Sequence, residues 1–394
     1  MRLAGRDVNQ AVTALHARFG PAFAFGVGPL HFVWLVGPEA ARFVTQEAAP
    51  HLALGPAYRF LRPVVGPAAL ITSDEPEHLR RRRLVQPTFY KERLGEAFRV
   101  VEGRLQALFT ELSRAGGPVD LYTALRGCVL GTICEVLLGA ETLARNPELT
   151  GFVAQMMGFA NLPFALQELK IPLPGTPWAR FVRARRRSDR LLYGEIRQRR
   201  LYGAESAGVM SLLLAARSED GAGLSDEEVR DQALSLVSAG FETTSAALTW
   251  AVYAVLEHPD VRAKLQDELE GLEALEYSTL NRLPYLERVV KETLRLYPPA
   301  PAALRVATAD LTFAGLHIPK GQRVALSVYA THREGASYPN PLRFDPDRWL
   351  TETPPHAYLP FGHGARYCIG AGLATGVIKF GLALLLRGYA LSPA

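Results

Sequence analysis

The sequence predicts a mainly α-helical protein with a minor β region, folded as a single large domain over residues 1–394. Long segments with apolar residues at helical spacing dominate the chain, above all Tyr90 to Ser113, Leu121 to Leu138 and Ser225 to Glu257. Short segments typical of strands lie only near the start and in the last third. Because no linker rich in glycine and serine divides the chain, one domain is the simplest organisation.

Prolines set the limits of several elements. Pro38 suits the first position of a helix, and His258-Pro259 closes the long helix that begins near Ser225. Four prolines and Gly175 make the stretch 161–178 rich in loops. The expected elements are helix Val8 to Phe19, strands Ala22 to Val27 and Leu30 to Val36, helices from Pro38, Tyr90 to Ser113, Leu121 to Leu138, Arg180 to Leu201, Ser225 to Glu257, Val261 to Glu270 and Tyr285 to Tyr297, strands Leu311 to Phe313 and Arg323 to Val328, a meander from Tyr338 to Pro355, and a last helix from Ala371 to Arg387.

The composition is that of a globular protein, with 48% hydrophobic and 21% charged residues. Its three cysteines, Cys128, Cys134 and Cys368, form neither a disulfide framework nor a zinc pattern, and this fits a cytoplasmic location. We read Cys128 and Cys134 as core packing. No segment approaches the roughly 18 uninterrupted apolar residues of a membrane span, so we expect no transmembrane segment.

Basic residues gather in two blocks, Arg80 to Arg83 and Arg183 to Arg190, and the net charge is +5. Neither block is interleaved with aromatic residues in the manner of a nucleic-acid motif, so we expect no nucleic-acid partner. Solvated helix faces or protein docking explain the blocks better. We expect the protein to be a monomer.

The most informative stretch is Phe361-Gly-His-Gly-Ala-Arg-Tyr-Cys368-Ile-Gly370. Gly362, Gly364 and Gly370 allow turns in which the backbone approaches a flat group closely, as a haem-binding cysteine requires. Amide N–H groups in such a turn can point at the sulfur, and the helix expected after Gly370 favours the thiolate. The alternative is a buried free cysteine beside a glycine-rich turn.

This stretch resembles the cysteine loop of the cytochrome P-450 family, F-x-x-G-x-x-x-C-x-G, at Phe361, Gly364, Cys368 and Gly370. The resemblance covers nearly the whole chain, with its motifs in the family's order. It implies a haem-thiolate monooxygenase of the soluble bacterial type, in a single cytochrome P-450-type domain. Haem b would be the cofactor, dioxygen the co-substrate and Cys368 the axial ligand of the iron.

A second stretch, Ala239-Gly240-Phe241-Glu242-Thr243-Thr244, lies inside the helix expected over 225–257. Glycine costs about 1 kcal/mol in a helix interior, so a functional or packing constraint must retain it. Small residues at 239 and 240 would let haem and a diatomic ligand approach; a helix–helix contact lined by small residues is the alternative. The stretch resembles the family's oxygen-activation motif, which implies that Thr243 orients water and that Glu242 relays protons.

Glu292 and Arg295 stand three residues apart and therefore on one face of a helix. Their apolar neighbours indicate a partly buried setting, where two charges need further partners. The family's E-x-x-R pair is joined by an arginine of the meander, and Phe344-Asp-Pro-Asp-Arg348-Trp349 resembles that segment. The resemblance therefore implies a structural role for Glu292, Arg295 and Arg348 around the cysteine loop.

The resemblance also implies partners for the two haem propionates. His78 and Arg82 share a helix face and match the family's H-x-x-x-R segment, while Arg305 and Arg366 match its other donors. The expected haem contacts are His78, Arg82, Ala239, Gly240, Arg305, Phe361, Gly362, Arg366 and Gly370. The expected substrate pocket contains Phe241, Ala302 and Leu304.

The chain carries no flavin or iron–sulfur motif and no cofactor of its own for NAD(P)H. The resemblance therefore implies electrons from a ferredoxin or flavodoxin with its reductase, and Arg80, Arg81 and Arg83 with the arginine-rich helix would offer a basic docking face. The proline-rich loop Leu162 to Trp178 beside that helix would contact a membrane surface weakly and admit a small lipophilic substrate, or simply cover the pocket as a solvated loop.

Two questions stay open at this point. A haem-thiolate protein that binds or senses a gas, or that uses peroxide without activating dioxygen, is the alternative function, although it has no need of the Glu242-Thr243 pair. Only seven residues, Gly388 to Ala394, follow the last helix, whereas the family usually continues into a hairpin that lines the pocket. We expect either a truncated sequence or a missing pocket wall.

Overall fold

The computed structural model describes residues 7–162, 169–203 and 208–392, which form two compact units. Unit 1 takes residues 1–57 and 246–394, and unit 2 takes residues 58–245. The predicted loop from Leu162 to Trp178 lies partly outside the described residues. The single domain expected over residues 1–394 stays a prediction.

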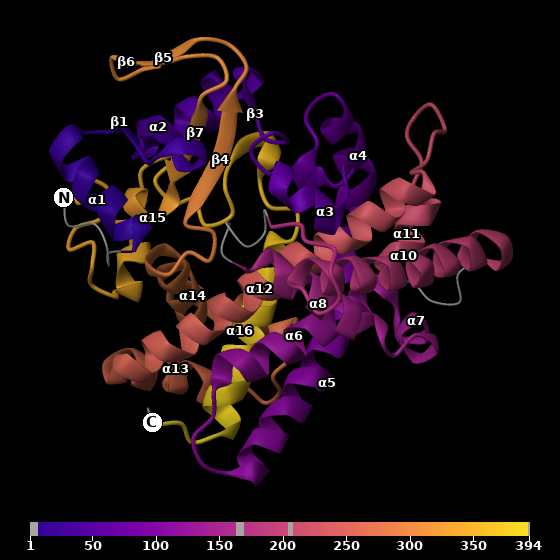
Figure 1. Ribbon diagram of the computed structural model, residues 1–394. Helices are drawn as coiled ribbons and strands as arrows, with labels where there is room; N and C mark the ends of the chain where they lie inside the picture. The colour runs from indigo at the N-terminus through magenta and orange to yellow at the C-terminus, as the bar shows by residue number, and fades with distance from the viewer. Residues whose placement is uncertain (1–6, 163–168, 204–207, 393–394) are drawn as a thin grey trace. The chain divides into compact units, whose positions relative to one another are not determined.

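Unit 1 is built around a five-stranded sheet whose strands come from both ends of the chain (Figure 1, indigo and orange). The strand β2 (Phe32–Leu35) pairs in parallel with β7 (Arg323–Ser327), and the other neighbours are antiparallel. Because β2 and β7 are far apart in sequence, this pairing ties the start of the chain to its last third. The full order is β1 (Ala22–Phe25), β2, β7, β4 (Ala302–Ala307) and β3 (Leu52–Ala53).

Side chains on the central strands alternate between two apolar clusters. Val33 and Leu35 belong to one cluster, whereas Trp34 belongs to the other. On β7, Val324 joins the first cluster and Ala325 the second. Successive residues of a strand point to opposite faces, so this sheet is covered on both sides.

The helices of unit 1 begin at residues suited to a helix start. Asp7 accepts a hydrogen bond from the amide of Asn9, and Pro259 and Pro284 occupy first helical positions. These elements carry the cysteine loop and its supports. They are α1 (Val8–Phe19), α2 (Pro38–Arg42), α13 (Pro259–Glu270), α14 (Pro284–Leu296), α15 (Val328–Thr331), α16 (Ala371–Gly388) and the hairpin β5 (Leu311–Phe313) and β6 (Leu316–Ile318).

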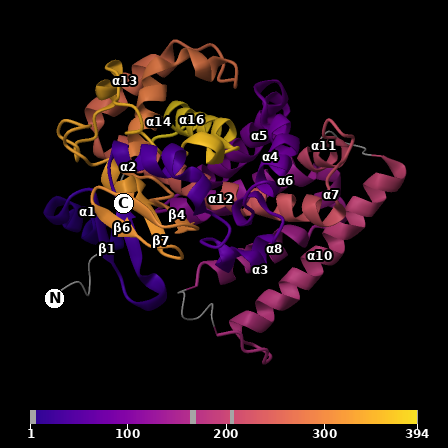
Figure 2. The ribbon, with the colours of Figure 1, turned by 90° about the horizontal axis from the view of Figure 1, so that it is seen from above.

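Unit 2 is helical. The helix α10 (Pro177–Tyr202) lies along α8 (Leu149–Ala160), where the rings of Phe159 and Phe181 stack with centroids 4.7 Å apart (Figure 2). Ser225 and Glu228 form a reciprocal capping box at the start of α12 (Asp226–Glu257), which ends in unit 1. The other helices are α3 (Arg62–Val65), α4 (Glu77–Val85), α5 (Lys91–Ala115), α6 (Leu121–Leu138), α7 (Ala140–Arg145), α8 (Leu149–Ala160), α10 (Pro177–Tyr202) and α11 (Val209–Ala215).

The predicted fold class is confirmed: the protein is mainly helical with a small β region. The predicted strands around the Gly28-Pro29 turn are shorter than expected, because Gly28–Leu30 forms a 3₁₀ turn between them. The elements that were not predicted are the helices α3, α7, α8, α11 and α15 and the strands β3 and β6. Cys134 is fully buried as expected, while Cys128 is half-buried and its thiol contacts the carbonyl of Arg104 at 3.5 Å.

Two described helices, α6 and α16, are long and apolar enough to cross a membrane by length and composition, with mean hydropathies of 1.5 and 1.4. Within the protein, 44% of α6 and 67% of α16 is buried. Core helices of globular proteins pass the same test, so this is weak evidence for a span and we assign none.

Candidate functional site

The cysteine loop of unit 1 presents its sulfur at the surface. Cys368 is exposed, and its amide donates to the carbonyl of Phe361 at 2.9 Å. Gly362 and Gly364 have φ of 71° and 67°, which side chains rarely adopt. The loop is therefore a closed turn that glycine makes possible, with an accessible thiol at its end.

The backbone of this loop also packs closely against a neighbouring segment of unit 1. A β-carbon at Gly364 would lie 2.8 Å from the carbonyl oxygen of Thr45. Just beyond the cysteine, α16 begins at Ala371 with no side chain capping its first turn. The positive end of that helix favours a thiolate over a thiol at Cys368.

The structure brings Glu292, Arg295 and Arg348 together in unit 1. Two N–H groups of Arg295 donate to the Glu292 carboxylate at 2.9 Å, and Arg348 Nε donates to it at 2.9 Å. The amide of Asp345 and the indole of Trp349 donate as well, at 2.9 and 3.1 Å. Glu292 and Arg295 are fully buried, and these partners satisfy the charges.

Arg295 has a second set of partners on the loops that follow β7. Its Nη1 donates to the carbonyls of His332 and Pro341, each at 2.7 Å. The His332 ring bonds back to the Arg295 carbonyl and also accepts the amide N–H of Leu359. His332 could not be identified from the sequence, because a histidine followed by arginine carries no spacing signal.

Two predicted propionate donors lie in unit 1. Arg305 is on β4, 7% exposed, and Nη1 donates to the carbonyl of Leu304 at 2.8 Å. Arg366 ends the 3₁₀ turn Gly364–Arg366 within the cysteine loop and is half-buried. Ala302 and Leu304, expected in the pocket, are half-buried on the same strand as Arg305.

In unit 2, one face of α12 carries exposed small and polar residues. Ala239 and Thr243 stand four apart and are both exposed. The Thr243 hydroxyl donates to the Ala239 carbonyl at 2.7 Å. It therefore competes with a backbone N–H group of the helix for this acceptor. Gly240 lies against α6, where a β-carbon would come within 2.8 Å of Ile133 Cδ1. Close helix packing thus accounts for the glycine.

Glu242 is held by three side chains that the sequence analysis did not identify. Tyr122 Oη donates to it at 2.7 Å, Arg126 Nε at 2.8 Å and Asn161 Nδ2 at 3.4 Å. Burial and the Glu242 contact raise the pKa of Tyr122 to about 12, so this hydroxyl stays a donor. Phe241 is 2% exposed and lies under the Arg126 guanidinium, so it is packed inside unit 2.

The helix α4 carries His78 and Arg82. His78 is 2% exposed, and its Nδ1 lies 2.9 Å from the Glu75 carboxylate; Arg82 is half-buried. Arg80 and Arg81, which were expected to dock a redox protein, instead form ion pairs with Glu228 at the start of α12. Their charges are engaged within unit 2, and only Arg83 of that block is exposed.

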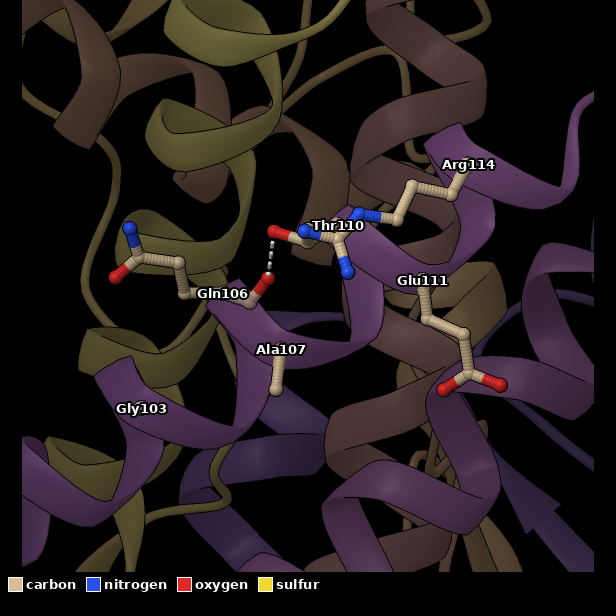
Figure 3. Close-up of a pocket in the computed structure, with 6 residues that line it drawn as sticks. All are labelled: Gly103, Gln106, Ala107, Thr110, Glu111 and Arg114. Carbon is tan, nitrogen blue, oxygen red and sulfur yellow. Dashed lines mark hydrogen bonds between the residues drawn. The ribbon is translucent and has the colours of Figure 1, made fainter.

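A solvent-exposed hollow on unit 2 is lined by one face of α5 (Figure 3). In it the Thr110 hydroxyl donates to the Gln106 carbonyl at 2.7 Å. None of the predicted site residues lines it, so we assign it no role in catalysis. The residues are Gly103, Gln106, Ala107, Thr110, Glu111 and Arg114.

Each unit by itself carries residues that suit a haem-thiolate protein. Unit 1 offers an exposed thiol on a turn of left-handed glycines, a helix N-terminus that favours the thiolate, and arginines on the same loop and on β4. Unit 2 offers a helix with exposed alanine and threonine one turn apart. Soft thiolate ligation and cationic partners are what an iron porphyrin with two propionates requires.

Comparison with known proteins agrees with this chemistry. The sequence model of the family described as Cytochrome P450 matches residues 2–394. A putative cytochrome P450 139 of Mycobacterium tuberculosis is 33% identical over 377 residues, covering 93% of this chain and 87% of the relative. Cyclooctatin synthase of Streptomyces melanosporofaciens is 33% identical over 384 residues, covering 93% of this chain and 82% of the relative.

Solved structures show the same likeness. The retinoic-acid-bound cyanobacterial CYP120A1 has a TM-score of 0.84 at 29% identity, covering 95% of this chain and 86% of the other. The haem domain of cytochrome P450DA has a TM-score of 0.85 at 28% identity, covering 98% and 88%.

The fold and these likenesses define a haem-thiolate oxygenase. The chain belongs to the cytochrome P450 family. It is therefore a monooxygenase that uses haem b and dioxygen, and the recognised resemblance is confirmed. Family membership favours this activity over the gas-sensing or peroxide-using alternative.

Proposed function

We propose that this enzyme inserts one oxygen atom of dioxygen into a small lipophilic molecule, by hydroxylation or epoxidation, with electrons from a separate redox protein. One observation carries the proposal: the exposed thiol of Cys368 ends a turn built on positive-φ glycines. Haem b, when bound, supplies the activation of dioxygen and the transfer of one oxygen atom.

The residues of the chain take distinct roles in this proposal. Cys368 binds the iron as a thiolate, and the haem propionates take their donors from α4, β4 and the cysteine loop. Phe361, Gly362 and Gly370 shape the turn, and the resemblance to the family implies that Ala239 and Gly240 of α12 would contact the haem. The propionate donors are His78, Arg82, Arg305 and Arg366.

Proton delivery falls to α12. Thr243 Oγ1 exchanges its bond to the Ala239 carbonyl for a water molecule and orients that water. The Glu242 side chain is 33% exposed and can take protons from solvent, while Arg126 and Tyr122 fix the position of its carboxylate. Glu242 therefore has to move away from these partners, or pass protons by way of water, to serve Thr243.

The relatives support a lipophilic substrate. A relative of known structure binds retinoic acid, and a relative found by its sequence is named cyclooctatin synthase. We propose a retinoid-like or other isoprenoid hydrocarbon skeleton as the substrate class, bordered by Ala302 and Leu304 of β4. Phe241 is buried beneath Arg126, so the proposed pocket does not include it.

A ferredoxin or flavodoxin with its reductase is the proposed electron donor. The exposed Arg83 contributes to the docking of such an acidic protein, whereas Arg80 and Arg81 are engaged by Glu228. Reversing Arg83 to glutamate is expected to slow reduction at low salt without changing substrate affinity. Unchanged reduction rates at low salt would contradict this docking site.

A weak contact with an anionic membrane surface is proposed for a different part of unit 2. Five exposed arginines follow one face of α10 over about 25 Å, and no ion pair within the described residues engages them. At the start of that helix the loop exposes Leu169, Ile171 and Leu173 by 53, 43 and 62%. Basic and apolar groups together suit a lipid interface. The arginines are Arg180, Arg183, Arg187, Arg190 and Arg197.

Co-sedimentation with vesicles tests this contact. Binding is expected to anionic phosphatidylglycerol vesicles and not to neutral phosphatidylcholine vesicles, and Arg183→Glu/Arg187→Glu should abolish it. Arg99→Glu/Arg114→Glu, which reverses two exposed charges on α5, is the control and should bind as the wild type does. Equal loss in both double variants would show only a net-charge effect.

The proposed activity is tested with heavy-isotope dioxygen. Incubating the holoenzyme with retinoic acid, an electron donor system and labelled dioxygen should give a product carrying one labelled oxygen atom. Label that enters from water, or turnover that needs only peroxide, would contradict the proposal.

A further inference from the structure

His332 occupies a junction between two parts of unit 1. It follows α15 directly, and its side chain is fully buried. Both ring nitrogens are within hydrogen-bond distance of backbone groups: Nδ1 lies 3.0 Å from the carbonyl oxygen of Arg295, and Nε2 lies 2.8 Å from the amide nitrogen of Leu359. The imidazole therefore spans α14 and the segment that leads into the cysteine loop.

The partners define the tautomer of this ring. The Leu359 amide can only donate, so Nε2 must be the unprotonated acceptor, and Nδ1 carries the proton that it donates to the Arg295 carbonyl. In an imidazolium both ring nitrogens carry protons. The Nε2–H would then point at the Leu359 N–H, and neither group would have an acceptor. Burial lowers the pKa of His332 to about 3, so the ring is neutral near pH 7.

The contact between His332 and Arg295 is reciprocal. Arg295 Nη1 donates to the His332 carbonyl at 2.7 Å, while the His332 ring donates to the Arg295 carbonyl. The ring of Tyr358 also stacks on the imidazole, with centroids 5.6 Å apart. The position of the imidazole is thus fixed by the same arginine that pairs with Glu292.

From Leu359, two backbone hydrogen bonds lead to the amide of Cys368. The Leu359 carbonyl accepts the amide of Gly362 at 3.0 Å, and the Phe361 carbonyl accepts the amide of Cys368 at 2.9 Å. A shift of Leu359 would move the first turn of the loop and with it the carbonyl that Cys368 bonds. The ring nitrogen of His332 holds Leu359 by its amide, one peptide unit before the carbonyl that Gly362 bonds.

We propose that His332 is a positioning residue for the thiolate. Its neutral imidazole is fixed by Arg295 of the buried Glu292–Arg295 pair, and it holds the Leu359 amide and thereby the position of the cysteine loop. The inference rests on the proposed role of Cys368 as iron ligand. It adds a residue that acts through Leu359 and does not touch the haem.

Two substitutions separate the two hydrogen bonds of the ring. In His332→Gln the amide oxygen can occupy the place of Nε2 and accept from Leu359. In His332→Asn the shorter amide reaches only the place of Nδ1 and can donate to the Arg295 carbonyl. If the hydrogen bond to Leu359 positions the thiolate, His332→Gln should keep the wild-type properties of the cysteine loop and His332→Asn should lose them. His317→Asn, at an exposed histidine of the β5–β6 hairpin, is the control.

Two measurements read out the effect. In the apoprotein, amide hydrogen exchange of the segment 359–368 should be about tenfold faster in His332→Asn than in wild type, and within about twofold of wild type in His332→Gln. In the reduced, carbon-monoxide-bound holoprotein, His332→Asn should convert at least half of the thiolate-type spectrum to the form without thiolate ligation. His332→Gln should keep most of it.

Several results would overturn the inference. Identical exchange and spectra in both variants, or equal losses in both, would show that the ring is only core packing. If His332→Asn fails to fold, His332→Gln alone decides: a protected segment supports the role, and fast exchange overturns it. The exchange measurement needs no haem, so a failure of this inference is distinguishable from a failure of Cys368 as ligand, which would leave the pigment unchanged in Cys368→Ser.

Discussion

The carboxylate of Glu292 and the guanidinium of Arg295 face each other through two N–H···O contacts of 2.9 Å, and neither side chain is exposed. An isolated pair of this kind would gain little, because removing two charges from water is costly. Here three further donors reach the carboxylate and three carbonyls accept from the guanidinium. The pair is the centre of a network that supports the cysteine loop.

Removing the charge of Glu292 should therefore damage the folded state. Glu292→Gln leaves the buried guanidinium of Arg295 uncompensated, and we expect the free energy of unfolding to fall by about 3–5 kcal/mol, with loss of haem retention. Denaturant unfolding and the pigment content of the purified protein measure this. Glu39→Gln is the control: its ion pair with Arg42 is largely exposed, so the change should stay within about 1 kcal/mol.

Two of the three glycines of the cysteine loop, Gly364 and Gly370, should respond differently to alanine. Gly364 has φ of 67°, and a β-carbon there would lie 2.8 Å from the Thr45 carbonyl oxygen. Gly364→Ala should cost about 1–3 kcal/mol and weaken haem retention. Gly370 has φ of −92° and no protein atom near its β-carbon position, so Gly370→Ala should be near neutral for the unfolding of the apoprotein. Thermal unfolding of the two variants compares them, and equal costs would contradict the geometry.

Thr243→Ala tests proton delivery. The substitution removes an exposed hydroxyl, so we expect electrons to be consumed with release of peroxide and little oxygenated product. Peroxide formed per electron pair is the measurement. Ser245→Ala removes a hydroxyl that also bonds the carbonyl four residues earlier but is fully buried, and it should leave the coupling intact. Equal uncoupling in both variants would assign the effect to the helix and not to the hydroxyl.

His332 should also make stability depend on pH. Because burial lowers its pKa in the folded state from 6.5 to about 3, the unfolded chain binds the proton first as the pH falls. The contribution is fully present above pH 6.5 and is lost toward pH 3, by about 1.4 kcal/mol per pH unit.

The difference between wild type and His332→Gln isolates this effect. Between pH 7 and pH 5 the wild type should lose about 2 kcal/mol more of its free energy of unfolding than the variant. The charged and titratable groups around the ring are Arg295, Arg333, Tyr338 and Tyr358, and none of them changes its charge in this range. Parallel pH profiles of the two proteins would contradict the neutral, buried state of the ring.

Helix positions and the main motifs could be predicted because local rules determine them. Residues 121–138 form a helix with the predicted limits, capped by Asp120, and the Glu292–Arg295 spacing placed both on one face. Strand β6 and helix α8 escaped prediction because both depend on tertiary packing more than on a strong local pattern.

Long-range partners were the main failure of the sequence analysis. Arg80 and Arg81 form a conspicuous basic block, but Glu228, which neutralises them, lies about 150 residues further on. His332 and the Arg126–Glu242 ion pair were missed for the same reason. Spacing along the chain reveals partners on one helix, whereas the partners of a charge on another element become visible only in the fold.

The absorption spectrum of the reduced, carbon-monoxide-bound protein tests the central claim most directly, because it reports whether a thiolate binds the iron. The wild type should show the thiolate-type Soret band, Cys368→Ser should lose it, and Cys128→Ser, at a half-buried cysteine of α6, should keep it. A Cys368→Ser protein with the unaltered wild-type spectrum would contradict the account.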